Sequence, residues 1–260
     1  MKITIVGTGN VAWHIGNHLA KKGVHIVQMY NRTIAKAHEL QHRIGYPIPC
    51  TDILDELTIP TDIYLLMTRD DVLPEIVAQL SLKNAIIAHT SGSSAMEVLG
   101  NGYNANIGVW YPFQTFSKGK EVILDTIPFC IEGNNENVRT TLFALASLVS
   151  SNVHYIDSQQ RKILHLTAIY TNNFANHLFT IAEELVTIHN LPFDFLRPLI
   201  QETAHKIQEL SPSLSQTGPA KRNDLRILQQ HENLLAEYPE YLAIYQLLTT
   251  SIQKKYLTND

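Results

Sequence analysis

The sequence has little cysteine, which excludes the small folds that depend on cross-links or on bound zinc. Only two of the 260 residues are cysteines, Cys50 and Cys130. Two thiols cannot form a disulfide framework or a four-cysteine zinc site, and such scarcity is typical of a protein from a reducing compartment. A chain of this length needs neither device, because it is long enough to bury a sizeable hydrophobic core.

Long hydrophobic runs and clusters of positive charge are also missing. No stretch approaches the roughly 20 apolar residues of a membrane-spanning helix. The apolar run after Met1 ends at Gly7, far short of a signal-peptide core. Lysine and arginine number 20 against 24 aspartates and glutamates, whereas nucleic-acid binding needs clustered cations. We therefore expect a cytoplasmic protein that binds neither nucleic acid nor a membrane.

The first half of the chain alternates short β-rich runs with segments of helical pattern, which is typical of a parallel sheet with crossover helices. Some runs, such as residues 85–88, are apolar throughout, as expected of a strand covered on both faces. Strands are predicted at 2–6, 24–30, 62–68, 84–89, 106–110, 127–131 and 152–156, and helices at 10–22, 33–43, 71–80 and 135–149. Residues 1–155 are therefore predicted to form an α/β domain of the Rossmann type.

Strand patterns stop after about residue 157. In the segment that follows, Leu178, Ile181, Leu185 and Ile188 recur at three- and four-residue spacing, as on one face of a helix. Helices are predicted at 158–190, 193–209, 224–236 and 239–255, and the Ser- and Pro-rich residues 210–220 are predicted to form an ordered loop. Residues 156–260 thus form a second, all-helical domain in this interpretation.

A glycine motif joins the first predicted strand to the first predicted helix. Gly7 allows a tight turn, Gly9 lets the backbone approach a diphosphate, and Ala12 lets the helix lie close to the sheet. The free N–H groups at the start of the helix then attract the anion. The residues are Gly7, Thr8, Gly9, Asn10, Val11 and Ala12. They predict a dinucleotide site, with a glycine turn in another α/β fold as the alternative.

The end of the second predicted strand indicates which dinucleotide binds. Proteins that bind NAD usually carry Asp or Glu there, which bonds the ribose hydroxyls; this chain has Asn31, Arg32 and Thr33. A carboxylate would repel the 2′-phosphate of NADP, whereas Arg32 can bind it through a forked contact. The pattern favours NADP(H) and counts against S-adenosylmethionine. In the alternative, Asn31 and Thr33 only cap the next helix and Arg32 is solvated.

Polar residues also follow three later strands, at the edge where open α/β sheets bind their ligands. These segments contain Thr68, Ser91 and Tyr111. Thr68 is assigned to the cofactor. Ser91 is the strongest candidate for contact with substrate, because it follows a strand directly and Gly92 lets a ligand approach the backbone. Helix caps and turns are the structural alternatives.

The first helix of the second half carries polar residues among apolar ones. They include His165, Asn172 and Asn173, and polar groups on a buried helix need a reason. Histidine titrates near neutral pH and can protonate the oxygen or nitrogen formed as hydride arrives. We therefore predict that His165 donates the proton and that Asn173 and Ser91 orient the substrate. The alternative is a core histidine with amides bonded between helices.

Two histidine pairs have the four-residue spacing of metal ligands, namely His14 with His18 and His38 with His42. No third ligand is evident near either pair, and the apolar stripe of the first helix lies on other residues. We expect four surface histidines and no metal.

Together these motifs resemble one family. The glycine motif with residues 31–33 is similar to the NADP-binding domain of the deazaflavin-dependent NADP reductase and pyrroline-5-carboxylate reductase group. The order of residues 89–93, 111–116, His165, Asn172, Asn173 and 218–224 resembles a subgroup of candidate NADP oxidoreductases over nearly the whole chain. The resemblance implies a Rossmann domain followed by a helical domain like that of 6-phosphogluconate dehydrogenase, which often dimerises.

The chain departs from the family pattern at Tyr111, where the family has histidine, and at Asn223, where glycine is frequent. Related hydroxyacid dehydrogenases use a lysine where Ile169 stands. The resulting prediction is hydride transfer between NADP(H) and a small carbonyl or imine substrate by a homodimer joined through its helical domain. A non-catalytic protein that binds or senses NADP on the same scaffold is the alternative.

Overall fold

The computed structural model describes residues 1–80, 85–100 and 106–257, and these divide into two compact units. The first unit is Met1–Asn173 and the second is Phe174–Asp260. Helix α5 (Ser158–Ala168) has its contacts in the first unit, although the sequence pattern grouped it with the helices that follow. The predicted functional boundary after residue 155 stays a prediction.

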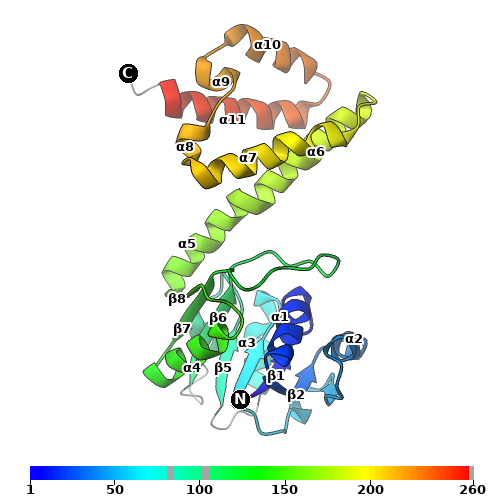
Figure 1. The fold of residues 1–260 in the computed structure, drawn as a ribbon, viewed down its shortest axis with the longest axis vertical. Helices are drawn as coiled ribbons and strands as arrows, with labels where there is room; N and C mark the ends of the chain where they lie inside the picture. The colour runs from blue at the N-terminus through cyan, green and yellow to red at the C-terminus, as the bar shows by residue number, and fades with distance from the viewer. Residues whose placement is uncertain (81–84, 101–105, 258–260) are drawn as a thin grey trace. The chain divides into compact units, whose positions relative to one another are not determined.

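The first unit is built on a mostly parallel eight-stranded sheet (Figure 1), in the order β3-β2-β1-β4-β5-β6-β7-β8. Among the strands of the described residues, only the β6–β7 pairing is antiparallel. The order reverses at β1, which has β2 on one side and β4 on the other. Ligands of open α/β sheets bind at such a switch point. The strands are β1 (Lys2–Val6), β2 (His25–Tyr30), β3 (Cys50–Thr51), β4 (Ile63–Leu66), β5 (Ile86–His89), β6 (Ile107–Pro112), β7 (Phe129–Gly133) and β8 (Val153–Tyr155).

Helices cover both faces of this sheet. Residues of α1 (Asn10–Lys21), α2 (Ile34–Ile44) and α4 (Glu136–Ser147) join one apolar cluster with one face. There, Leu142 of α4 accepts the indole N–H of Trp110 on its carbonyl oxygen at 3.2 Å. The shorter α3 (Leu73–Gln79) buries Leu73 and Ile76 in a second cluster on the other face. This doubly covered sheet confirms the predicted Rossmann fold.

Each of the seven predicted strands is present, with small shifts at its ends. The sequence pattern missed β3, because two residues are too few to show alternation. The predicted helix at 71–80 begins as a 3-10 turn, Asp70–Val72, before α3. Two further 3-10 turns are Leu54–Glu56 and Met96–Leu99.

The prediction of surface histidines is wrong for His14. Its side chain is buried, and its Nε2 lies 3.0 Å from the carbonyl oxygen of Ser117. Helical periodicity could not show this, because the covering segment lies about 100 residues further along the chain. Within the described ranges, no group of three His, Cys, Asp or Glu residues could hold a metal ion.

The helix that carries His165 begins with a capping box and is followed directly by a π-helical turn. Asp157 and Gln160 form a capping box at the N-terminus of α5, which satisfies two backbone N–H groups that a helix start leaves free. A π-helical turn, Ile169–Phe174, follows α5 directly. Such turns are frequent at functional sites, and this one contains Asn172 and Asn173.

The second unit is helical, as predicted. It contains α6 (Ala175–Ile188), α7 (Arg197–Glu209), α8 (Pro212–Ser215), α9 (Pro219–Arg222), α10 (Leu225–Leu234) and α11 (Pro239–Leu257), with a 3-10 turn at Phe193–Phe195. The Ser- and Pro-rich segment holds the short α8 and the start of α9, so the loop prediction was wrong there. Asn223 ends α9 in the left-handed conformation, and the Asp224 side chain then caps α10.

The second unit has little core of its own. Among its described residues only Ala220 and Leu228 are buried apolar side chains, while many large apolar side chains are exposed. Separately, no helix in the described part of the chain is long and apolar enough to cross a membrane.

Candidate functional site

The turn between β1 and α1 has the shape that the glycine motif predicts. Gly7 has a φ of +96°, and a Cβ there would lie 2.6 Å from both the Met67 carbonyl oxygen and Thr68 Cγ2. Only glycine fits such a position, because any side chain would be strained and would also collide with the end of β4. A Cβ on Gly9 would meet no atom within 4 Å, so the backbone there borders open space.

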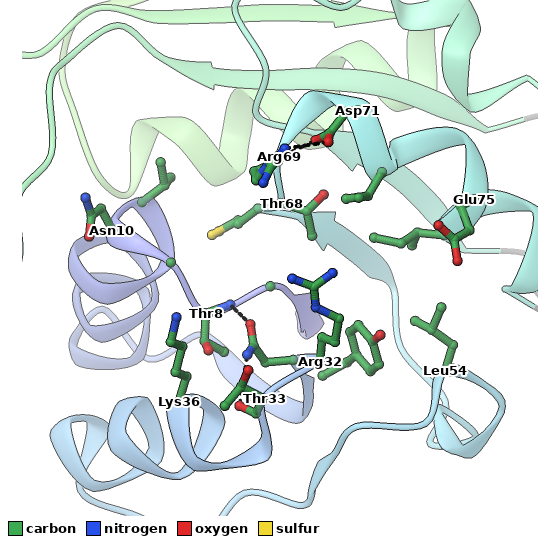
Figure 2. Close-up of a pocket in the computed structure, with 18 of the residues that line it drawn as sticks. Thr8, Asn10, Arg32, Thr33, Lys36, Leu54, Thr68, Arg69, Asp71 and Glu75 are labelled. Carbon is green, nitrogen blue, oxygen red and sulfur yellow. Dashed lines mark hydrogen bonds and ion pairs between the residues drawn. The ribbon is translucent and has the colours of Figure 1, made fainter.

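A cavity of about 550 Å³ lies against this turn, within the size range of small-molecule and cofactor sites. Figure 2 shows Thr8 and Asn10 at the turn, Arg32, Thr33 and Lys36 beside it, and Thr68 and Arg69 across the cavity. Every residue predicted to bind cofactor lines this one cavity: Gly7, Thr8, Gly9, Asn10, Val11, Asn31, Arg32, Thr33 and Thr68. Their binding role stays a prediction, but the fold brings them together from three segments.

Two hydroxyl groups of the cavity wall have no protein partner. Oγ1 of Thr8 and Oγ1 of Thr68 are buried and make no hydrogen bond to the described residues. A buried polar group left unpaired costs on the order of 1–3 kcal/mol, and oxygens of a bound nucleotide would remove that cost. These two threonines therefore fit a phosphate- or ribose-bearing ligand.

Asn31 ties the end of β2 to the glycine turn. The backbone N–H of Thr8 donates to Asn31 Oδ1 at 3.1 Å, and Asn31 Nδ2 donates to the carbonyl oxygen of Thr33 at 2.9 Å. Thr33 is the N-cap residue of α2, yet its side chain makes no capping bond. The helix-capping alternative therefore does not account for either side chain, and both residues line the cavity.

Positive charge gathers at the end of β2. Arg32 and Lys36 are exposed, line the cavity and form no ion pair with any residue that the structure describes. Arg69, by contrast, is paired with Asp71 at 2.6 Å. The sequence prediction missed Lys36. Lys36 lies in the first turn of α2 and Arg32 just before the N-cap residue Thr33, so a second cation shortly after Arg32 in the sequence was the available signal.

A second, smaller cavity of about 240 Å³ lies where β6 ends, beside α5 and the π-helical turn. It is at the same carboxyl edge of the sheet, and all its lining belongs to the first unit. The wall carries hydroxyl, amide and imidazole groups and no Lys, Arg, Asp or Glu. It is lined by Tyr111, Phe113, Gln114, Thr115, His165, Ala168, Ile169, Thr171, Asn172 and Asn173. The predicted His165 and Asn173 therefore share one cavity.

Tyr111 and His165 meet in the wall of this second cavity. The Tyr111 hydroxyl oxygen lies 3.4 Å from His165 Nδ1, and the rings are edge to face. Burial, and then the nearby Cys130 thiol, raise the pKa of Tyr111 to about 12. The phenol is therefore protonated at neutral pH and can donate. The sequence analysis placed Tyr111 in a strand-end segment at the ligand-binding edge and noted it as a departure from a family motif, but assigned it no catalytic role.

Gly92 makes room for that pair. A Cβ on Gly92 would lie 2.7 Å from His165 Nδ1 and 2.8 Å from the Tyr111 hydroxyl oxygen. Real Cβ atoms essentially never come so close. The predicted role of Gly92 was close approach of a ligand, whereas the structure shows close approach of these two side chains.

Ser91 shapes the loop after β5. Its Oγ accepts the backbone N–H groups of Ser93 at 3.1 Å and of Ser94 at 2.8 Å, and its side chain is buried. It lines neither cavity. The structure thus brings Ser91 close to the site through its loop, and its contact with substrate stays a prediction.

The buried Arg161 fixes α5 to this loop. Its guanidinium, which is 0% exposed, donates to Glu132 Oε2 at 2.5 Å and to the Ser94 carbonyl oxygen at 2.6 Å. A charge-assisted bond of this kind is shorter and stronger than a neutral one. His165 follows one helical turn later, so Arg161 holds it against the loop. Sequence reasoning missed Arg161, because its position in the pattern is that of an ordinary surface arginine.

Over 97% of this chain and 98% of the other, the chain is 40% identical to a protein of Bacteroides fragilis described as a candidate NADP oxidoreductase, with a TM-score of 0.89. The chain belongs to this family. Residues 1–68 also match the shikimate/quinate 5-dehydrogenase family, and residues 127–252 match a domain of unknown function, DUF2520.

More distant structures share the fold of this family. A Thermotoga maritima protein is 20% identical over 97% of both chains, with a TM-score of 0.73. A 1-pyrroline-5-carboxylate reductase of Streptococcus pyogenes is 12% identical over 98% of both chains, with a TM-score of 0.65. The predicted resemblance to the pyrroline-5-carboxylate reductase group is thereby confirmed for the fold. Among curated protein sequences, none matches this chain.

Proposed function

We propose that the protein transfers hydride between NADP(H) and a small carbonyl or imine substrate. The observation that carries this proposal is the cavity at the β1–α1 turn, where a glycine at positive φ, two unpartnered buried hydroxyls and two unpaired cations meet. A diphosphate, a ribose and an additional phosphate would satisfy these groups. The family relative described as a candidate NADP oxidoreductase supports the same assignment.

Each wall of the cavity has its own part in holding the dinucleotide. The free backbone N–H groups at the start of α1, from Gly9 to Val11, bind the diphosphate together with the positive end of the helix dipole. Thr8 and Thr68 donate their hydroxyls to it or to the ribose. The nicotinamide, when bound, supplies the hydride chemistry, and the protein supplies position and shelter from water.

The choice of NADP over NAD rests on Arg32 and Lys36. Their charges have no partner within the described residues, and no carboxylate stands at residues 31–33 to bond ribose hydroxyls. A 2′-phosphate carries the charge that would pair with both. Thr33 adds a hydroxyl on the same side.

The substrate belongs in the cavity that His165 and Asn173 line. Its volume of about 240 Å³ admits a small molecule. We assign His165 to proton transfer, Asn173 to orienting the carbonyl or imine group, and Ser91 to the substrate side through the loop that it shapes. The absence of charged groups from the wall favours an uncharged substrate over a carboxylate.

We also propose that the protein is a homodimer joined through the helical second unit. Large apolar side chains are exposed there, including Leu199, Leu214, Leu225, Leu234 and Leu247, each at more than 60%. The number of these exposed leucines, on a unit with little core of its own, supports an association surface there. The two free cysteines support a location in the reducing cytoplasm.

The experiment that tests the function combines binding with turnover. Calorimetry measures the affinity of the protein for NADPH and NADH, and oxidation of NADPH is then followed at neutral pH with small aldehydes, ketones and cyclic imines. Binding with turnover supports the oxidoreductase. Binding without turnover of any compound would instead favour the alternative, a protein that senses NADP.

A further inference from the structure

We propose that Tyr111 is a catalytic residue, whose hydroxyl gives the proton to the substrate while His165 replaces that proton. This inference rests on the proposed function and deepens it, because it moves the direct donor from the histidine to a tyrosine that sequence reasoning did not select. In this proposal the two side chains form a proton relay, in which the proton passes from His165 to Tyr111 and from Tyr111 to the substrate.

The contact between them is held from three sides. Tyr111 ends β6, His165 lies on α5, and Gly92 belongs to the loop after β5. Arg161 bonds the same loop at the Ser94 carbonyl oxygen and bonds Glu132 on β7. The absence of a Cβ on Gly92 is what lets the hydroxyl and Nδ1 approach to 3.4 Å. Both side chains also line the 240 Å³ cavity, so the pair is reachable by a small ligand.

Other groups near Tyr111 keep its hydroxyl protonated. Burial has the largest effect on its pKa, and the Cys130 thiol and Asp70 raise the pKa further, whereas Arg161 lowers it. His165 is the titratable group in direct contact. A phenol in this setting is a proton donor at neutral pH, and it remains more acidic than the alcohol that forms when the alkoxide created by hydride addition takes a proton.

The proton and electron balance is complete without another reactant. As hydride reaches the substrate carbon, the C=O electron pair moves to oxygen, and that oxygen takes the proton as the Tyr111 O–H bond breaks. The phenolate takes a proton from Nδ1 of His165 while Nε2 takes one from solvent, so the imidazole ends neutral. Nε2 makes no hydrogen bond to the residues that the structure describes, which leaves it available for this exchange.

The test compares two kinds of substrate in the full-length protein. A ketone or aldehyde needs both hydride and proton, whereas an N-methylated cyclic iminium ion needs only hydride. Y111F should lower kcat for the carbonyl by about 10²- to 10⁴-fold, the usual contribution of a general acid. It should leave NADPH affinity and the rate with the iminium ion nearly unchanged. Y155F is the matched control, because Tyr155 is exposed and lines neither cavity.

A second measurement varies the acidity of the Tyr111 hydroxyl instead of removing the hydroxyl. Fluorinated tyrosines placed at position 111 keep the ring and the hydroxyl but make the phenol more acidic. The rate with the carbonyl substrate should change as the phenol becomes more acidic. A hydroxyl with a purely structural role would not give this dependence.

The outcomes separate this inference from the function on which it rests. Failure of the wild-type protein to bind NADPH, or to reduce any carbonyl or imine, would contradict the proposed function and this role with it. If the wild type is active, three results would overturn only the role of Tyr111. They are an unimpaired Y111F, an equal loss of rate in Y111F on both kinds of substrate, or rates that do not change with fluorination.

Discussion

The hydroxyl oxygen of Tyr111 lies 3.4 Å from Nδ1 of His165, although 54 positions separate the two residues in sequence. The sheet brings one side chain to its carboxyl edge and α5 brings the other to the same place. Gly92 lies against both. This arrangement makes the end of β6 part of the site, beside the nucleotide cavity predicted from the glycine motif.

Replacing His165 by alanine should spare NADPH binding and lower turnover sharply. The expected loss in kcat is about 10²- to 10⁴-fold, because the relay to Tyr111 is cut. Steady-state kinetics and NADPH titration of the same preparation measure both effects. His25→Ala is the control, since His25 is exposed and lines neither cavity. Turnover equal to that of the wild type would remove His165 from the mechanism.

Arg32→Ala and Lys36→Ala should each weaken NADPH binding while leaving NADH binding nearly unchanged. A hydrogen bond to a charged group contributes about 1.5–3 kcal/mol, which corresponds to roughly a 10- to 150-fold loss in affinity. Calorimetry with both nucleotides measures the difference, and Lys120→Ala, at an exposed position outside the cavity, is the control. Equal losses for NADPH and NADH would argue against a 2′-phosphate site.

Gly92→Ala should separate Tyr111 from His165 and destabilise the fold. The new methyl group would lie under 3 Å from both side chains, and overpacking of this kind costs typically 1–3 kcal/mol. Urea unfolding gives the stability, and kinetics give the loss of turnover. Gly119→Ala is the matched control, because a Cβ there meets nothing within 4 Å. A Gly92 variant as stable and active as the Gly119 variant would show that the close approach has no role.

Stability should fall as the pH drops from about 6.5 toward 4, because of His89. Burial, and then the charge of Arg161, lower the pKa of His89 to about 4. Only the neutral ring can accept the Ser91 N–H on Nδ1 while Nε2 faces the Ala95 carbonyl oxygen. His89 of the unfolded chain binds a proton at higher pH than His89 of the folded chain. The stability that the neutral His89 contributes is therefore complete above pH 6.5 and is lost as the pH falls through the pKa of the folded state.

The shift of His89 corresponds to about 3 kcal/mol over that interval. Urea unfolding at pH 7, 6, 5 and 4 measures the slope. His89→Gln keeps hydrogen-bonding atoms without titrating, and its stability should vary less with pH by about that amount. Identical pH profiles for the two proteins would contradict this assignment.

Local pattern was sufficient for the Rossmann sheet and for bringing the predicted cofactor-binding residues to one cavity. The glycine motif and residues 31–33 lie within about 30 residues of one another, and the turn geometry at Gly7 is dictated by a single residue type. Lys36 was within reach of the same reasoning, because it stands four positions after Arg32, in the first turn of the helix that follows. The carboxyl edge of a parallel sheet then brought Thr68 to the same cavity.

The second cavity shows what a single sequence leaves out. Arg161 has the pattern of a solvated arginine until β7 supplies Glu132, 29 residues away in sequence, and the loop after β5 supplies a carbonyl. Ser91 was selected because it directly follows a strand and precedes a glycine, yet its hydroxyl oxygen accepts hydrogen bonds from its own loop. His14 was assigned to the surface because the segment that covers it is distant in the chain. In each case the missing information is a long-range contact.

The most direct test of the account is calorimetric titration of the folded wild-type protein with NADPH and, separately, with NADH. We predict one site per chain, with NADPH bound more tightly than NADH. A protein that is folded by circular dichroism and takes up neither nucleotide would contradict the central claim that the β1–α1 turn holds a nicotinamide dinucleotide.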